Sequence, residues 1–185
     1  MDRHLAFPTF PELATKRLRL REITAADLDW YLDHFSTLEI VEGQGYPAPM
    51  DREGAAAELH RYVLDLFASR NGFRWGLALG SDPTLIGSIG LYKWIDQPRR
   101  QAEVGYDLAP ARWGHGYMTE SLAAVVDFGF EQMALERIEA FVMVRNDRSA
   151  RLLERGGFVR EATFRAHGED EHGVLVDEYR YALER

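Results

Sequence analysis

A glycine-rich turn directly before a long amphipathic segment constrains the fold of this chain more than any other feature. The turn reads Arg112-Trp113-Gly114-His115-Gly116-Tyr117-Met118-Thr119-Glu120, with two glycines one residue apart. Glycine lets the backbone adopt turn conformations and come close to a ligand without a side chain in the way. A helix that starts here directs its free amide N–H groups and the positive end of its dipole at that ligand. The segment therefore predicts a loop-to-helix site for an anionic group such as a phosphate.

Apolar residues along the rest of the chain follow two periods. Helical spacing begins at Thr24, Asp51, Tyr117 and Asn146. Residues 1–14 contain two prolines and are predicted to form an N-terminal arm. The element order predicts one mixed α/β domain over residues 15–185. Alternating apolar residues, typical of strands, cover residues 16–23, 73–79, 85–94, 102–108, 138–144, 158–165 and 174–183.

Composition limits the classes of protein to which such a domain can belong. Apolar runs fall short of the about 18 residues that a membrane span needs, and the start of the chain lacks the apolar core of a signal peptide. The absence of cysteine excludes disulfides, zinc–thiolate sites and thiol nucleophiles. A net charge of −8 argues against nonspecific nucleic-acid binding. We therefore expect a cytoplasmic enzyme or binding domain with neither nucleic acid nor membrane as a partner.

The charge is distributed unevenly along the chain. Residues 22–58 hold nine acidic residues against one basic residue, whereas residues 145–155 hold four arginines against two acidic residues. The second region suits an anionic ligand, and the first suits a cationic one. The alternative is that both are solvated helix faces. His167 and His172 flank three acidic residues, and we interpret this segment as a polar loop and expect no metal site.

Four further motifs accompany the glycine turn. They are Thr15–Arg21 at the first strand, Gly87-Ser88-Ile89-Gly90-Leu91, Glu103-Val104-Gly105-Tyr106 and the block Asn146–Phe158. With these motifs in this order, the chain from Thr15 onward resembles the GNAT superfamily of acetyl-CoA-dependent N-acetyltransferases. Within the superfamily it is most similar to the ribosomal-protein N-terminal (Rim-type) branch. The resemblance implies a mostly antiparallel central sheet, flanked by helices, in which one pair of parallel strands splays apart.

The resemblance also implies where acetyl-CoA binds. Its diphosphate would lie on the backbone amides from Gly114 to Thr119, and its pantetheine arm would pair with the end of the strand over residues 103–108. Asn146 would contact the pantetheine, and Ser149 would lie near the thioester sulfur. The residues expected to contact the cofactor are Tyr106, Leu108, Arg112, Trp113, Gly114, His115, Gly116, Tyr117, Met118, Thr119, Asn146, Arg151 and Leu152.

The chain departs from the family where many members carry a tyrosine that serves as the acid. Here that position is Leu153, which shifts an acid role toward Ser149. The alternative is that Ser149 only satisfies backbone donors in the first helical turn, and that Asn146 is only a helix cap. Cysteine is absent and no serine lies in an evident triad setting, so we predict direct attack of an amine without an acetyl-enzyme intermediate.

The energetics of that attack bear on the nature of the acceptor amine. Making a protein α-amine neutral at pH 7 costs about 1.4 kcal/mol, whereas a lysine side chain costs about 4.6 kcal/mol. An α-amine therefore needs only a modest base, for which Glu103 acting through water is the candidate. The released thiolate has a cysteine-like pKa near about 8.5, so a hydrogen bond from Ser149 would suffice. Positioning is then the main catalytic contribution. The alternative for Glu103 is a solvated strand residue.

The acceptor itself is predicted only by class. We expect a primary amine, foremost a protein or peptide N-terminal α-amine, with Tyr46 and Trp94 as candidate walls of its site because they lie beside loops. Alternatives are a small-molecule amine such as an antibiotic, a polyamine or an amino acid. Two other classes are a noncatalytic acyl-CoA-binding module and a nucleotide-binding protein. A homodimer is left open.

Overall fold

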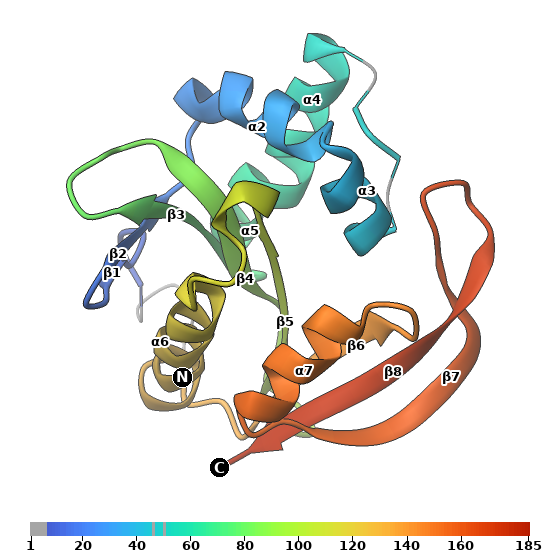
Figure 1. Cartoon of the computed structure of the whole chain (residues 1–185). Helices are drawn as coiled ribbons and strands as arrows, with labels where there is room; N and C mark the ends of the chain where they lie inside the picture. The colour runs from blue at the N-terminus through green and yellow to red at the C-terminus, as the bar shows by residue number, and fades with distance from the viewer. Residues whose placement is uncertain (1–6, 46, 50) are drawn as a thin grey trace.

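The computed structural model describes residues 7–45, 47–49 and 51–185. These residues form one eight-stranded sheet in the order β1-β2-β3-β4-β5-β6-β8-β7, with helices around it (Figure 1). The strands are β1 Leu13–Ala14, β2 Leu18–Glu22, β3 Phe73–Leu79, β4 Leu85–Ile95, β5 Gln101–Leu108, β6 Arg137–Met143, β7 Val159–Glu169 and β8 Leu175–Glu184. The helices are α2 Leu28–Phe35, α3 Leu38–Gln44, α4 Arg52–Leu59, α5 Asp65–Ala68, α6 Tyr117–Glu131 and α7 Asp147–Arg155.

The pair β5–β6 is parallel, and the other neighbouring strands are antiparallel. Pairing between β5 and β6 covers only Gln101–Glu103 against Arg137–Glu139. Among the residues that the structure describes, Val104 to Leu108 of β5 therefore have no strand partner on this side, which leaves the backbone N–H and C=O groups of that edge without a ladder. The expected splayed parallel pair is confirmed, and it opens an edge on which an extended ligand can pair as an added strand.

Helices cover both faces of the sheet. On one face, α6 buries the stripe Met118, Leu122, Val125 and Val126 against the main core cluster, which includes Trp75, Leu77 and Ile89. On the other face, α2 and α4 form a second cluster with the sheet, made of Ile23, Tyr31, Ala55, Leu59, Val63, Ala78 and Leu85. In Figure 1, α2, α3 and α4 lie together above the end of the sheet at which α6 and α7 begin.

Local signals account for the helix starts. Thr24 and Asp27 form a capping box at the entry to α2, and the Asp51 side chain accepts from the N–H of Gly54 at the start of α4. The helix predicted from residue 51 onward is interrupted by a π-helical turn over His60–Leu64. Helix α3 was not expected, because seven residues with a glycine next to last carry too little periodicity. None of the helices in the described ranges is long and apolar enough to cross a membrane.

The described part of the predicted N-terminal arm packs onto the domain. Phe7 is only 9% exposed and its ring lies 5.1 Å from that of Phe73. The indole N–H of Trp75 donates to the carbonyl of Pro11. Leu13 and Ala14 form β1 against β2. Residues 7–14 therefore contribute to the core.

Candidate active site

The glycine turn adopts the geometry that its sequence requires. Gly114 and Gly116 have φ values of +78° and +76°, in the left-handed region that glycine enters without strain. A Cβ added to Gly114 would meet no atom within 4 Å, so the backbone there faces open space. Helix α6 begins at Tyr117 directly after Gly116. Its unpaired N–H groups therefore open onto the same space.

The short segment between β1 and β2 holds this turn in place. Arg17 donates from Nη1 to the carbonyl of His115 at 2.8 Å and from Nε to Glu120 at 2.7 Å. The hydroxyl of Thr15 donates to the same carboxylate. Burial alone would raise the pKa of Glu120, but the bonds from Thr15 and Arg17 outweigh it and lower the pKa. The motif at the first strand thus braces the loop, a role that the sequence alone did not reveal.

A groove of about 760 Å³ runs from this turn to the start of α7. Of the residues expected to contact the cofactor, His115 alone does not line it among those that the structure describes. Its ring instead stacks on that of Tyr117. The groove is lined by Tyr106, Leu108, Arg112, Trp113, Gly114, Gly116, Tyr117, Met118, Thr119, Asn146, Arg151 and Leu152, together with Arg145, Arg148 and Arg155 and with the acidic residues Glu39, Glu42, Asp107 and Asp147.

Two contacts organise the wall of the groove. The indole N–H of Trp113 donates to the carbonyl of Leu108 at 2.7 Å, which fixes the ring at the end of β5. The guanidinium of Arg148 lies 3.4 Å from the centre of that ring. This cation–π contact holds a positive charge from α7 at the groove. The groove therefore combines backbone donors on one side with arginines on the other, as binding of an anion demands.

At its inner end, the groove reaches Tyr106, Asn146 and Ser149. The Asn146 side chain accepts from the N–H of Ser149 at 3.1 Å and caps α7, while its amide nitrogen donates to the carbonyl of Gly43 at 3.3 Å. The hydroxyls of Tyr106 and Ser149 lie 2.7 Å apart. Burial raises the pKa of Tyr106 and outweighs its bond to Ser149, so the phenol is neutral at pH 7. Leu153 is fully buried in the core, and no acid acts from that position.

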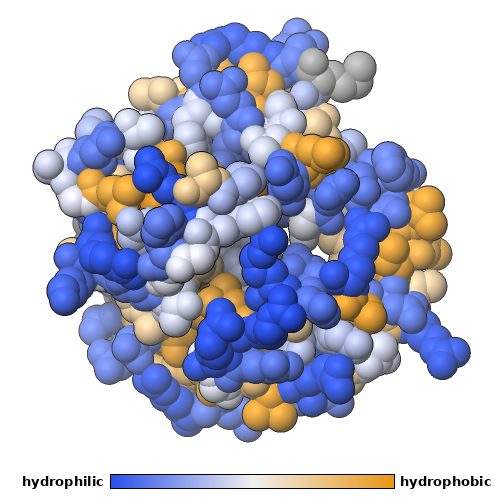
Figure 2. Space-filling view, viewed as in Figure 1, coloured by the Kyte–Doolittle hydropathy of each residue, from blue (hydrophilic) through white to orange (hydrophobic). Residues whose placement is uncertain are grey.

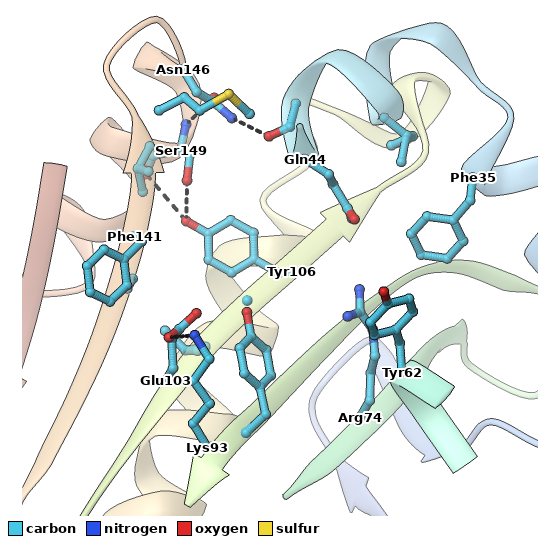
Figure 3. Close-up of a pocket in the computed structure, with 18 of the residues that line it drawn as sticks. Phe35, Gln44, Tyr62, Arg74, Lys93, Glu103, Tyr106, Phe141, Asn146 and Ser149 are labelled. Atoms are coloured by element: carbon cyan, nitrogen blue, oxygen red, sulfur yellow. Dashed lines mark hydrogen bonds and ion pairs between the residues drawn. The ribbon is translucent and has the colours of Figure 1, made fainter. Parts of the chain in front are cut away.

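A second cavity of about 590 Å³ lies on the far side of these three residues. Tyr106, Asn146 and Ser149 line both spaces. Figure 3 shows Tyr106 directed at Ser149, with Glu103 and Lys93 on one side of the cavity and Phe35, Tyr62 and Arg74 on the other. From the side seen in Figure 1, the surface is hollowed between the upper helices and α7, and hydrophilic residues surround the hollow (Figure 2). The aromatic wall consists of Tyr31, Phe35, Tyr62, Tyr92, Tyr106 and Phe141.

Glu103 lies in this second cavity, on the last residue of β5 that pairs with β6. Its carboxylate is 2.7 Å from the ammonium of Lys93. The side chain of Glu103 is 15% exposed, whereas that of Lys93 is 69% exposed. The carboxylate is thus mostly buried in the wall of this cavity and is paired with one exposed cation.

The chain also matches known proteins. A family model described as the acetyltransferase (GNAT) domain matches residues 17–159. The chain belongs to this family. It is 35% identical over 158 residues to the N-acetyltransferase YoaA of Bacillus subtilis (strain 168), a match that covers 85% of this chain and 88% of that protein. The motif-based resemblance is confirmed, and the protein is an N-acetyltransferase.

Solved structures share the fold of this GNAT protein. The ribosomal-protein-S5-alanine acetyltransferase from Vibrio fischeri superposes with a TM-score of 0.81 at 20% identity, over 94% of this chain and 96% of that one. The spermidine N-acetyltransferase from Vibrio cholerae, solved with CoA and spermine, gives 0.79 at 21% identity, over 92% and 96%. At these identities the two neighbours show the fold alone. Acetyl-CoA is the general cosubstrate of the GNAT family to which the chain belongs.

A buried carboxylate that the sequence did not reveal, Asp107, lines the groove of the GNAT domain and is held by residues from four other elements. Asp107 accepts from Arg74 Nη2 at 2.6 Å, from the backbone and hydroxyl of Ser88 at 2.9 and 2.6 Å, and from Gln44 at 3.2 Å. His34 Nε2 lies 2.6 Å from it. Burial alone would raise the pKa of Asp107, but His34, Arg74 and Ser88 outweigh it and lower the pKa to about 2. The residue therefore stays ionised and ties α2, α3, β3 and β4 to the end of β5.

Trp94 and Tyr46 are the two residues predicted to line the acceptor site, which would lie in the second cavity (the acceptor-side cavity). Trp94 does not line the acceptor-side cavity; it is 4% exposed and packs in the aromatic core near Phe7 and Phe73. The register of β4 shifts between Tyr92 and Ile95, and this irregularity turns Trp94 inward. Tyr46 lies outside the described residues. Within the described ranges, no three His, Asp or Glu side chains are grouped to hold a metal, and His167 pairs with Glu178 instead.

Proposed function

We propose that this GNAT enzyme transfers an acetyl group from acetyl-CoA to a primary amine by direct attack in a ternary complex. The observation that carries the proposal is the meeting of two cavities at Tyr106, Asn146 and Ser149. One cavity has backbone donors and arginines suited to a diphosphate, and the other is an aromatic space with a carboxylate. An acyl group at the shared residues is then open to attack from the second cavity.

The residues of the groove fit acetyl-CoA. Open space at Gly114 and the free N–H groups of the first turn of α6 would receive the diphosphate. Arg148, held over Trp113, would supply charge beside it. The unpaired edge of β5 from Val104 onward would accept the pantetheine amides as an added strand. That placement brings the thioester to Tyr106 and Ser149.

Attack of an amine on the thioester requires the protein to position both reactants and to supply one hydrogen bond to the leaving thiolate. The neutral amine adds to the thioester carbon, the C–S bond breaks, and the amine loses its extra proton to water beside Glu103. The thiolate receives a hydrogen bond from Ser149. Full proton transfer from Tyr106 is disfavoured, because an ordinary tyrosine lies about 1.5 pKa units above a thiol, or about 2 kcal/mol, and burial raises the pKa of Tyr106 further. Tyr106 instead donates to the Ser149 oxygen, which leaves the Ser149 proton free to point at sulfur.

A protein or peptide N-terminal α-amine is the acceptor that we favour. Glu103, whose carboxylate is paired with Lys93, is the candidate base, and an α-amine needs less help from a base than a lysine side chain because its pKa is lower. The Vibrio fischeri neighbour is named a ribosomal-protein-S5-alanine acetyltransferase, which is a name for an enzyme with a protein acceptor. The second candidate is a small-molecule amine. The volume of the acceptor-side cavity, about 590 Å³, lies within the range of small-molecule sites.

Release of CoA tests the proposal directly. The chain contains no cysteine, so every thiol that a thiol reagent detects comes from CoA. Acetyl-CoA should yield free CoA when peptides with free N-termini or small amines are added, and mass spectrometry should find the acetyl group on the amine. Ser149→Ala should lower the rate while leaving CoA binding intact. Tight CoA binding without transfer to any member of a broad panel would instead favour a noncatalytic binding module.

A further inference from the structure

We propose that Glu58 binds a second positive charge on the acceptor, so that the preferred substrates are amines that carry another ammonium or guanidinium group. This inference rests on the proposed function and names the acceptor class for the same cavity. Glu58 lies on α4, where Ala55 and Leu59 are buried against the sheet. Glu58, Tyr62 and Leu66 all line the acceptor-side cavity. Their spacing of four residues places them on one face of the helical segment.

Glu58 differs from the other carboxylates of the cavity in having no partner. Glu103 is paired with Lys93 at 2.7 Å, and Glu178 lies 2.7 Å from His167 Nδ1. Among the described residues, no hydrogen bond or ion pair is formed by Glu58. A partly buried carboxylate without a partner loses hydration and gains nothing in return. Consistently, burial raises the pKa of Glu58.

The nearby cations are engaged elsewhere. The guanidinium of Arg74 donates to Asp107 at 2.6 Å and to Ser88 at 2.9 Å. That of Arg61 lies 5.3 Å from the centre of the Tyr62 ring. Arg74 is therefore engaged by Asp107, and Arg61 lines the same cavity without forming an ion pair with Glu58. A cation that enters the cavity can pair with this carboxylate.

The surroundings of Glu58 are those of a cation site. Tyr31 and Tyr62 line the same cavity. Burial raises the pKa of Tyr31, and the Glu58 carboxylate adds to the rise although Arg74 opposes it, which places the carboxylate within electrostatic reach of that ring. Aromatic faces beside a carboxylate attract ammonium and guanidinium groups through both cation–π and ionic forces. A neutral or anionic group gains neither.

The position of Glu58 also separates the two amines of such an acceptor. Tyr62, one helical turn after Glu58, lies across the cavity from Tyr106, Ser149 and Glu103 (Figure 3). An acceptor that spans the cavity would place one cation at Glu58 and its reacting amine at Ser149. Diamines and peptides with a basic second residue have this shape.

Matched acceptor pairs test the inference. Putrescine is compared with butylamine, and a peptide with arginine as second residue is compared with its citrulline counterpart. The wild-type enzyme should favour the charged member of a pair by about 10-fold or more in kcat/KM. Glu58→Gln should remove that preference through KM, with kcat for the uncharged member unchanged. The control is Glu53→Gln, an exposed carboxylate on α4 that does not line the cavity, and it should retain the preference.

The possible results separate the two proposals. Transfer to both members of each pair with equal efficiency overturns the role of Glu58 and leaves the acetyltransferase proposal standing. A preference that survives in Glu58→Gln does the same. If the wild-type enzyme binds CoA but acetylates no amine in the panel, both proposals fall. Thermal unfolding and CoA affinity of Glu58→Gln should equal those of the wild type, which excludes loss of folding as the cause.

Discussion

A single methyl group at Gly114 tests the placement of the diphosphate. Gly114 has φ +78°, and an added Cβ would meet no protein atom within 4 Å. Alanine there would suffer only the strain of the left-handed conformation, about 1–2 kcal/mol. Gly173, in the turn between β7 and β8, has φ +73° and the same open surroundings. Gly173→Ala is therefore a control with matched backbone strain, remote from the groove.

The two variants should differ in CoA binding. In Gly114→Ala the methyl group enters the space where a diphosphate would approach the backbone N–H groups. Each hydrogen bond to a charged group contributes about 1.5–3 kcal/mol. Loss of one such bond weakens CoA binding about 10- to 150-fold, whereas Gly173→Ala should leave the affinity unchanged.

Calorimetric titration with CoA measures this difference, and thermal unfolding of the free proteins measures the strain. Both variants should show a similar loss of stability. Equal CoA affinity in Gly114→Ala, Gly173→Ala and the wild type would refute the placement of the diphosphate at this turn. Equal weakening in both variants would show that strain, transmitted through the fold, controls binding.

Three other perturbations follow from the site. Tyr106→Phe should lower kcat by up to about 10-fold in steady-state assays, which is the contribution of one hydrogen bond, and should change KM for acetyl-CoA little. The control is Tyr179→Phe, which lies outside both cavities and should match the wild type. Because the folded-state pKa of Asp107 is lowered to about 2, its contribution to stability is complete above the unfolded pKa near 3.9 and is lost as the pH falls toward 2. Between pH 5 and 2, the free energy of unfolding of the wild type should fall by about 2 kcal/mol more than that of Asp107→Asn. Denaturant unfolding of both proteins across this pH range measures the difference. Glu103→Gln should reduce acetylation of a lysine side chain more than that of an α-amine, measured as kcat/KM; an equal reduction would contradict its role as a weak base.

Features encoded by neighbouring residues could be predicted from the sequence. Gly114 and Gly116 predict the turn because only glycine fits both left-handed positions without strain. Asn146 predicts the start of α7 because its side chain caps the helix, and Ser149 follows in the first turn. The splay between β5 and β6 came from the family resemblance, since no local pattern reports where two distant strands stop pairing.

Features that depend on distant residues could not be predicted. His34 and Asp107 are 73 residues apart in the chain, and neither stands in a local pattern that predicts the contact. Trp94 illustrates a different difficulty. Ile89 and Leu91 are buried, so continued alternation would bury residue 93, but the shift in register after Tyr92 exposes Lys93 and turns Trp94 into the core. A one-residue slip reverses which side chains face the site.

The buried carboxylate of Asp107 connects the helices beside the acceptor-side cavity to the end of β5. Helices α2, α3 and α4 contribute one part of the wall of the acceptor-side cavity, and the strands of the sheet, with Tyr106 on β5, contribute another. His34 and Gln44 attach α2 and α3 to Asp107, the residue that follows Tyr106. Breaking one partner of a buried ionic network is strongly destabilising, because it leaves a charge without compensation. In the proposed mechanism, Asp107 thus fixes the helices beside the acceptor-side cavity to the strand along which the thioester would lie.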